Sequence, residues 1–187
     1  MRRFIVLLSV VVVVLLDLAT TGGLRTAAQE ATPAAAPSFT VGSLAPIGEP
    51  FELLPGVTIE FLNEGQPAAA SDHTLVLYRV TIQPGGVGIP SHIHPGATAL
   101  TVEEGSFTWT LQAGTVRVTR PGQTPEDVTE SGTELILSPG EGLSYNDDVV
   151  HIANAGGDGP VSVLVASLFE TGQPVFMLTD EHGTPTP

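Results

Sequence analysis

Residues 84–96 read PGGVGIPSHIHPG, and this stretch decides how the rest of the sequence is interpreted. On an extended strand, side chains two positions apart point to the same face and lie about 7 Å apart. His92 and His94 therefore direct their imidazole rings toward one point, while Ile93 between them points the opposite way. The Gly- and Pro-rich approach to His92 stiffens the backbone that presents the pair. The stretch predicts a chelating histidine pair; two surface histidines without a ligand are the alternative.

A third histidine supports the chelating interpretation. The chain has five His, and His151 lies in another alternating stretch, at 149–153. Three neutral imidazoles can bind a divalent first-row ion and leave positions open for water or a ligand. His73, which follows an Asp at the head of a strand, is predicted to lie at the surface or to cap a turn, and His182 is predicted to be solvated. The predicted ligand set is therefore His92, His94 and His151.

The whole region after residue 50 has the pattern of short strands. Period-two alternation recurs there, each stretch is closed by Gly, Pro or Asn, and none has the apolar spacing of a helix. The predicted strands cover 57–62, 75–82, 98–103, 107–111, 116–119, 134–137, 149–153 and 161–168. The turn at residues 112–115 predicts a hairpin between 107–111 and 116–119, with Gly114 at a positive φ. About ten short strands in roughly 130 residues favour a sandwich or barrel, so the fold class is all-β.

The first 28 residues have the pattern of a secretory signal peptide: a basic start, an apolar run over 4–16 and small residues before Gln29. The predicted divisions are a signal peptide at 1–28, a flexible Ala- and Pro-rich linker at 29–48, a β-barrel domain at 49–178 and a disordered tail at 179–187. The chain is therefore predicted to be secreted. An uncleaved N-terminal anchor is the alternative, although the apolar run is shorter than the roughly 20 residues of a spanning helix.

The charge and cysteine counts exclude several classes of partner and site. The chain has 6 Lys and Arg against 20 Asp and Glu, a formal net charge of −14 at pH 7. Nucleic-acid binding needs clustered cations, so nucleic acid is excluded as a partner. The acidic surface should also repel anionic lipid, so no membrane contact is expected after signal cleavage. With no Cys, disulfides, thiolate ligands and a cysteine nucleophile are excluded, and any metal must be held by His, carboxylate or water.

Two spaced motifs resemble those of the cupin superfamily. Its first motif runs Gly, five residues, His-x-His, three or four residues, Glu, six residues, Gly, and residues 86, 92, 94 and 105 keep that spacing. In its second motif, Gly140 and His151 keep the register, whereas Asn146 and Asp148 replace the family's Pro and Gly, and Asn154 comes one residue early. The resemblance covers about 49–178. It implies a cupin-like double-stranded β-helix, that is, a jelly-roll barrel.

The largest departure from the family pattern is at the metal-binding Glu. Thr98 stands in its place, with Ala99 as the only other position that the variable spacing allows. Without a carboxylate the site would keep the full +2 charge of a bound ion, which favours zinc, iron or copper over harder ions. The Thr98 hydroxyl can orient a metal-bound water through a hydrogen bond. An ordinary β-branched strand residue is the alternative interpretation.

Two classes of function fit this sequence. One is a secreted metalloenzyme acting on a small molecule, of the dioxygenase or isomerase type that the family resemblance implies. The other is a non-catalytic module that binds or stores a small ligand, which agrees with the missing Glu. The resemblance also favours a homodimer. Trp109, Tyr145, Phe107 and Phe169 are candidates to line a ligand cavity, with an ordinary core role as the alternative.

Overall fold

The part of the chain that the structure describes, residues 40–43 and 47–186 of a computed structural model, is built from β-strands. The strands are β1 (Phe51–Leu54), β2 (Val57–Gly65), β3 (His73–Ile82), β4 (Ile89–Ile93), β5 (Gly96–Glu104), β6 (Phe107–Ala113), β7 (Val116–Thr119), β8 (Glu126–Val128), β9 (Glu134–Leu137), β10 (Gly142–Tyr145), β11 (Val150–Ala155), β12 (Val161–Glu170) and β13 (Met177–Leu178). These residues include no helix, and hence none that could cross a bilayer. The predicted signal peptide at 1–28 lies outside the described residues.

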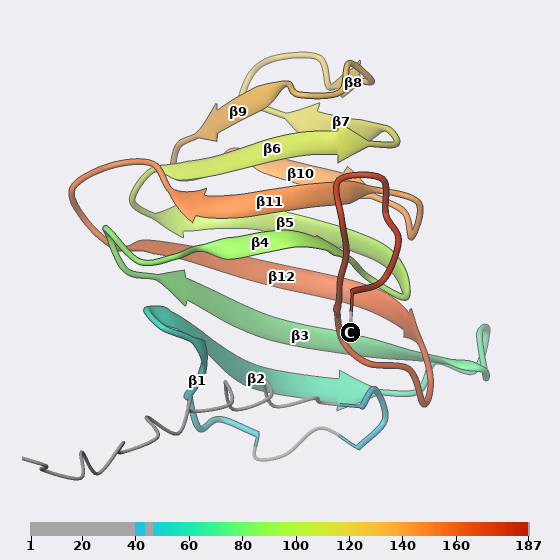
Figure 1. The fold of residues 1–187 in the computed structure, drawn as a ribbon. Helices are drawn as coiled ribbons and strands as arrows, with labels where there is room; N and C mark the ends of the chain where they lie inside the picture. The colour runs from blue at the N-terminus through green and yellow to red at the C-terminus, as the bar shows by residue number, and fades with distance from the viewer. Residues whose placement is uncertain (1–39, 44–46, 187) are drawn as a thin grey trace, which may run out of the picture. The chain divides into compact units, whose positions relative to one another are not determined.

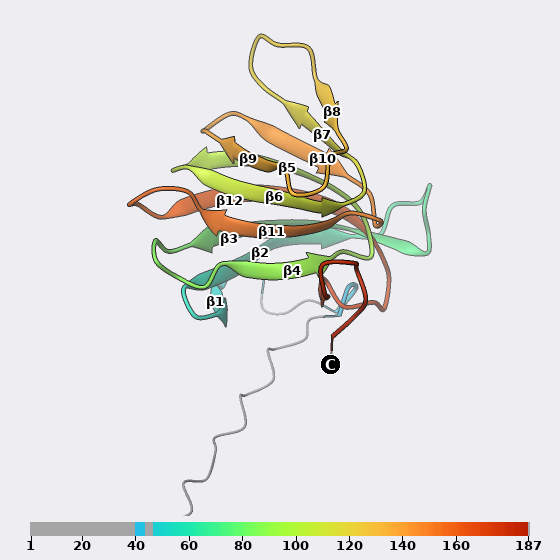
Figure 2. The same ribbon diagram turned by 45° about the horizontal axis from the view of Figure 1, so that its top comes forward.

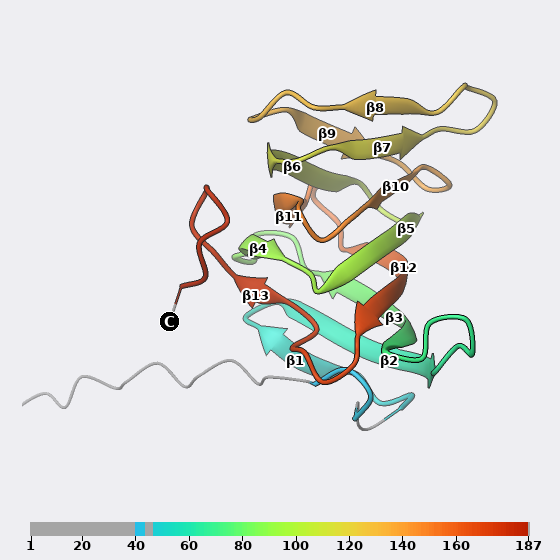
Figure 3. The same ribbon diagram turned by 90° about the vertical axis from the view of Figure 1, so that its right-hand side faces the viewer.

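The strands form two antiparallel sheets that face each other as two layers (Figure 3). The larger sheet has eight strands in the order β1-β2-β3-β12-β5-β10-β7-β8, and the smaller has five in the order β13-β4-β11-β6-β9. In Figure 1 the long strand β12 lies between β3 and β5, and it pairs with both along most of its length. This is the predicted all-β jelly roll.

The alternation of buried and exposed side chains explains why these residues form a two-layer fold. Along β12, Val161, Val163 and Val165 are buried, and the residues between them are less so. Phe61 on β2 and Trp109 on β6 fill the space between the sheets and are fully buried. One face of each sheet is therefore apolar and packs on the other, which is the main source of stability in such a fold.

The hairpin predicted at residues 112–115 is wrong. β6 pairs with β11 and β9 in the smaller sheet, whereas β7 pairs with β10 and β8 in the larger one. Gly114 does have a positive φ, of 92°, but it stands where the chain crosses from one sheet to the other. A Cβ at Gly114 would lie 2.8 Å from a side-chain atom of Val149, so the crossing is tight.

Residues at both ends of the predicted domain are joined to it by backbone hydrogen bonds. Within the predicted linker, Val41 is buried and its N–H donates to the carbonyl of Gln173. Within the predicted tail, the N–H of Thr179 donates to Ser91, and that of Thr186 to Leu178. Hydrogen bonding thus continues outside 49–178, while the proposed division of the chain stays a prediction.

Candidate metal centre

Two neighbouring strands of the smaller sheet present the three predicted histidines. His92 on β4 and His151 on β11 are directly paired across the ladder, and their ring centroids are 4.0 Å apart. His94 follows β4 immediately, and its ring lies 5.0 Å from that of His92 and 5.4 Å from that of His151. Figure 2 shows β4 beside β11. One ligand atom from each residue lies within 4.8 Å of the others, so the structure brings the three side chains together.

A close backbone contact holds the two histidine-bearing segments in place. Gly88, just before β4, has a φ of +67°, and a Cβ there would lie 1.8 Å from Oδ1 of Asn154 and 2.6 Å from the carbonyl of Ala153. Only a residue without a side chain fits at this point. The first motif therefore approaches β11 closely enough for β4 and β11 to pair.

The placement of the two sequence motifs identifies the fold. The first motif lies on β4 and β5, the second on β10 and β11, and the histidines of both meet between two facing antiparallel sheets. The domain has a jelly-roll fold. Its two motifs come from both sheets, since β4 and β11 belong to the smaller sheet and β5 and β10 to the larger.

Backbone carbonyls fix the position of the proton on each imidazole of the site. The Nδ1 atom of His92 lies 2.8 Å from the carbonyl of Pro90, and that of His94 lies 2.9 Å from the carbonyl of Val175. Nδ1 of His151 is 3.3 Å from the carbonyl of Val149. Because a carbonyl oxygen can only accept, each Nδ1 carries the proton and donates it. Nε2 is therefore the ring nitrogen that has a lone pair for an ion in each residue, which is the usual arrangement of metal-ligating histidines.

Burial keeps these imidazoles neutral. Desolvation, together with the neighbouring His94, lowers the pKa of His92 to about 3. Desolvation also lowers the pKa of His94 to about 4. The pKa of His151 lies well below its ordinary value for the same reason, with further contributions from His92 and His94. Neutral imidazole is the form that binds metal, so the folded site is preset for a cation.

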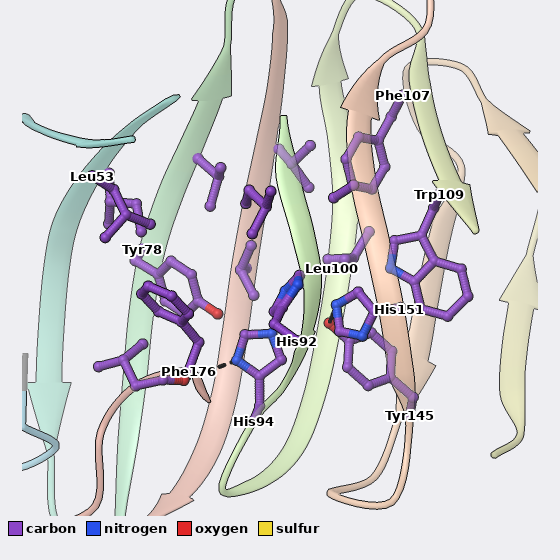
Figure 4. A pocket seen from close by; sticks show the side chains of 17 residues that line it. Leu53, Tyr78, His92, His94, Leu100, Phe107, Trp109, Tyr145, His151 and Phe176 are labelled. Carbon is purple, nitrogen blue, oxygen red and sulfur yellow. Dashed lines mark hydrogen bonds between the residues drawn. The ribbon is translucent and has the colours of Figure 1, made fainter. Parts of the chain in front are cut away.

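A small cavity of about 50 Å³ opens beside the histidines. Its wall is mostly aliphatic and aromatic, and Figure 4 shows the side chains of Leu100, Trp109 and Tyr145 around the histidines. Among the described residues that line it, none is Asp, Glu, Lys or Arg. The centre therefore lies in an apolar environment with no charged protein group in the cavity wall.

Thr98 is buried but does not line this cavity. Its hydroxyl lies 3.0 Å from that of Ser167 on β12, and its Cα is paired with Tyr145 on β10. The Tyr145 hydroxyl lies 3.4 Å from Nε2 of His151. The position of the family's Glu is thus occupied by a hydroxyl that reaches the histidines through its neighbours. The proposed role of Thr98 in orienting a metal-bound water stays a prediction.

The four aromatic residues proposed from the sequence as cavity-lining candidates lie either in the cavity wall or against a histidine. Trp109, Tyr145 and Phe107 line the cavity, whereas Phe169 stacks on His94 with ring centroids 5.5 Å apart. The cluster of potential metal ligands contains neither of the remaining two histidines.

The three described arginines are engaged in ion pairs with acidic side chains. Arg79 pairs with Glu60 and Glu103, Arg117 pairs with Asp127, and Arg120 pairs with Glu126 and Glu141.

Two residues of the site were missed by sequence reasoning. Tyr78 on β3 lines the cavity, and Ser167 on β12 contacts Thr98. Both have inward parity on alternating strands, which is the one signal that pointed to them. Parity alone does not say which inward residues of distant strands become neighbours.

The chain matches no model of a known protein family and no curated protein sequence. Among solved structures it is similar to recombinant oxalate oxidase in complex with glycolate, with 17% identity over 66% of this chain and 55% of that chain and a TM-score of 0.43. It is also similar to KdgF from Halomonas sp., with 18% identity, 70% and 93% coverage and a TM-score of 0.45. A second oxalate oxidase structure is likewise covered over only 56% of its length. Likenesses at this level identify no activity.

Proposed function

We propose that this chain is a secreted, single-domain metal-binding cupin that holds one divalent transition ion through His92, His94 and His151 and binds a small molecule beside it. One observation carries the proposal. Three buried imidazoles donate their Nδ1 protons to backbone carbonyls, and one ligand atom from each lies within 4.8 Å of the others.

The donor set favours borderline ions. Three neutral nitrogen ligands suit zinc, iron or copper, whereas manganese and magnesium prefer carboxylate oxygen. Bound in this site, such an ion would supply Lewis acidity, or oxygen activation in the case of iron or copper. The chain's own residues contribute an apolar wall that excludes water and the hydroxyls of Tyr78 and Tyr145 that face the bound molecule.

A non-catalytic role in binding or storage is the second candidate. It is favoured by the absence of Asp, Glu and Lys from the described residues of the cavity wall, because general acid–base chemistry usually depends on such groups or on histidines that are free of metal. Dioxygen uptake by the iron- or copper-loaded protein with enolic or diketone compounds separates the two. An oxygen-activating enzyme consumes dioxygen with at least one of them, and a binding module consumes none.

The metal proposal is tested by elemental analysis of protein made without a histidine tag. We expect about one first-row ion per chain, and loss of that ion in each of His92→Ala, His94→Ala and His151→Ala. His182→Ala is the matched control, because this exposed histidine lies outside the cluster, and it should keep the ion. If the three cluster variants fold and retain full metal content, the site is wrong.

Secretion is proposed on the pattern of residues 1–28 alone. Mass spectrometry of protein recovered from the medium of an expressing culture should find a mature chain that begins at Gln29. A chain that stays with the cell membrane and keeps Met1 would favour the anchored alternative. The homodimer likewise stays a prediction, for which the mass of the mature protein in solution is the measurement.

A further inference from the structure

Tyr145 brings a hydroxyl to the edge of the histidine cluster. Its oxygen lies 3.4 Å from Nε2 of His151, and Figure 4 shows it turned toward that ring. The side chain is buried and lines the cavity. In a tetrahedral site with ligand bonds of about 2.0–2.1 Å, neighbouring ligand atoms are about 3.4 Å apart. The Tyr145 oxygen therefore lies at the distance from Nε2 that a further ligand of the same ion would have.

Strand pairing places Tyr145 beside the position of the family's metal-binding Glu. Thr98 stands at that position on β5, and its Cα is paired with that of Tyr145 on β10. Side chains directly opposite each other on antiparallel strands have Cβ atoms about 5 Å apart and enter the same space. Thr98 does not line the cavity, whereas Tyr145 does. The oxygen ligand that residue 98 lacks is thus available from its neighbour across the ladder.

A chain of buried hydroxyl groups leads to the Tyr145 oxygen. Tyr78, Ser167, Thr98 and Tyr145 lie on β3, β12, β5 and β10, which are adjacent in that order in the larger sheet, and all four are buried. Ser167 and Thr98 are hydrogen-bonded at 3.0 Å. The hydroxyl of Tyr78 is hydrogen-bonded to Ser167, and that of Tyr145 to Thr98. We call these four residues the hydroxyl row.

The number of protons in the row fits a Tyr145 that has lost its own when an ion is present. Four hydroxyls offer four O–H donors, whereas a row of four has only three links. In the metal-free domain Nε2 of His151 accepts the extra proton from Tyr145, because Nδ1 of His151 donates to Val149. An ion on Nε2 would occupy that lone pair. Without the Tyr145 proton, three donors make three links, and the last one ends on the Tyr145 oxygen.

The charge of the site gives a second reason for an oxygen anion. Three neutral imidazoles leave the +2 charge of an ion uncompensated, and the described residues that line the cavity include no Asp or Glu. A buried charge needs a compensating partner nearby. Burial raises the pKa of Tyr145 in the metal-free domain, so the phenol keeps its proton until a cation arrives. A cation at ligand distance opposes this effect, because it favours the ionised oxygen.

We propose that Tyr145 is the fourth protein ligand of the ion and binds it as a phenolate, in place of the carboxylate that residue 98 lacks. When the ion binds, the oxygen–metal bond forms as the O–H bond breaks, the proton passes to solvent, and no electron is transferred. Thr98 and Ser167 are positioning residues, because they act on the Tyr145 oxygen and not on the ion. This inference rests on the proposed function, since it requires an ion on the three histidines.

The test uses mature protein made without a histidine tag and titrated with Cu²⁺ alone, because a phenolate bound to Cu²⁺ gives a charge-transfer absorption in the visible range. We expect this band in wild type, saturating at about one ion per chain, and none in Tyr145→Phe. The variant should still bind Cu²⁺, at least about tenfold more weakly, because three histidines remain.

Proton release on Cu²⁺ binding is the second measurement. Calorimetry near neutral pH in buffers of different ionisation enthalpy counts the released protons. Wild type should release about one proton per ion and Tyr145→Phe about none, since the imidazoles are already neutral. Equal proton release by the two proteins contradicts a phenolate ligand.

Tyr78→Phe is the matched variant, because the chain has only two Tyr. Tyr78 lies at the far end of the row, and its ring packs near that of Phe61. This variant should keep the band and the released proton. A band that persists in Tyr145→Phe overturns the inference, as does Cu²⁺ binding by wild type without a band; in both cases the metal proposal stands. A wild type that binds no Cu²⁺ overturns the proposed function itself, because nitrogen sites bind Cu²⁺ more tightly than the other candidate ions.

The positioning role of Thr98 has a separate spectroscopic readout. Thr98→Val removes the hydroxyl with little change in volume. It should move the band to longer wavelength, because a phenolate that accepts no hydrogen bond is less stabilised and gives up charge more easily. Thr98→Ser keeps the hydroxyl and should restore the wild-type band. If Thr98→Val and Thr98→Ser give the same band, Thr98 acts through packing, and the row does not position the Tyr145 oxygen.

Discussion

Acidification should destabilise the metal-free domain steeply, because three imidazoles are buried in neutral form. Burial lowers the pKa of His92 to about 3 and that of His94 to about 4, and the pKa of His151 moves in the same direction. In an unfolded chain a histidine titrates near pH ~6.5. Below that pH the unfolded state therefore binds more protons than the native state. Stability is fully present above about pH 6.5 and is lost as the pH falls toward the folded pKa values.

The size of this effect follows from the number of buried histidines. Each contributes about 1.4 kcal/mol per pH unit once its unfolded form is protonated, so three contribute about 4 kcal/mol per unit and roughly 6 kcal/mol between pH 7 and pH 5. A typical domain has a total stability of about 5–15 kcal/mol. Glu103 and Asp180, whose pKa values lie below their ordinary range, contribute mainly at lower pH. The histidines alone are thus expected to remove by pH 5 a free energy comparable with the total stability at the lower end of that range.

Urea unfolding at pH 7, 6 and 5 in the presence of a chelator measures this dependence. His94→Gln should reduce the loss of unfolding free energy between pH 7 and 5 by about one third, since one of three buried bases is gone. The control His182→Gln removes a solvent-exposed imidazole and should not change the loss. A wild-type free energy of unfolding that stays constant over this range refutes the reasoning, as does an equal loss in His94→Gln.

Three further predictions concern the ion, the missing carboxylate and the close backbone contact. With free ion at 100 times its Kd, a chelator at neutral pH should lower the unfolding free energy by about 2.7 kcal/mol; a Tm that does not change with chelator shows that no ion binds the native state. Thr98→Glu should lower the Tm of the metal-free protein by burying a carboxylate, and Mn²⁺ should raise it again because that ion prefers oxygen ligands; no response to Mn²⁺ would mean that position 98 does not reach the ion. Gly88→Ala should cost more than about 3 kcal/mol in urea unfolding because its Cβ would overlap Asn154. Gly122→Ala, which also has a positive φ but open space around it, should cost about 1–2 kcal/mol, and equal costs would show that the overlap relaxes freely.

The strands and the histidine set were predictable from sequence because both depend on local spacing. Alternation located β3 and β12, and the spacing of His92 and His94 placed both side chains on one face. The partner sheet of each strand was not predictable. β6 and β7 have the alternation of a hairpin, but that pattern is the same whether two strands pair or join opposite layers.

The contact between Thr98 and Ser167 was not predictable for a related reason. In the sequence, Thr98 is distinguished only by standing in the place of the family's metal-binding Glu. Its contact with Ser167 depends on the pairing of β5 with β12. Their positions in the sequence differ by 69. The alternation of apolar and polar residues does not specify such a register. It shows which residues of each strand point inward, but not which inward residues of two distant strands lie opposite each other.

The carbonyl of Val175 holds the proton of His94 across 81 positions of sequence. The site is thus completed by the segment that follows the last long strand. A chain that ends before this segment contains the carbonyl acceptors of only two of the three imidazoles. Folding of this late segment therefore orients the last of the three predicted ligands, although His94 itself belongs to the first half of the domain.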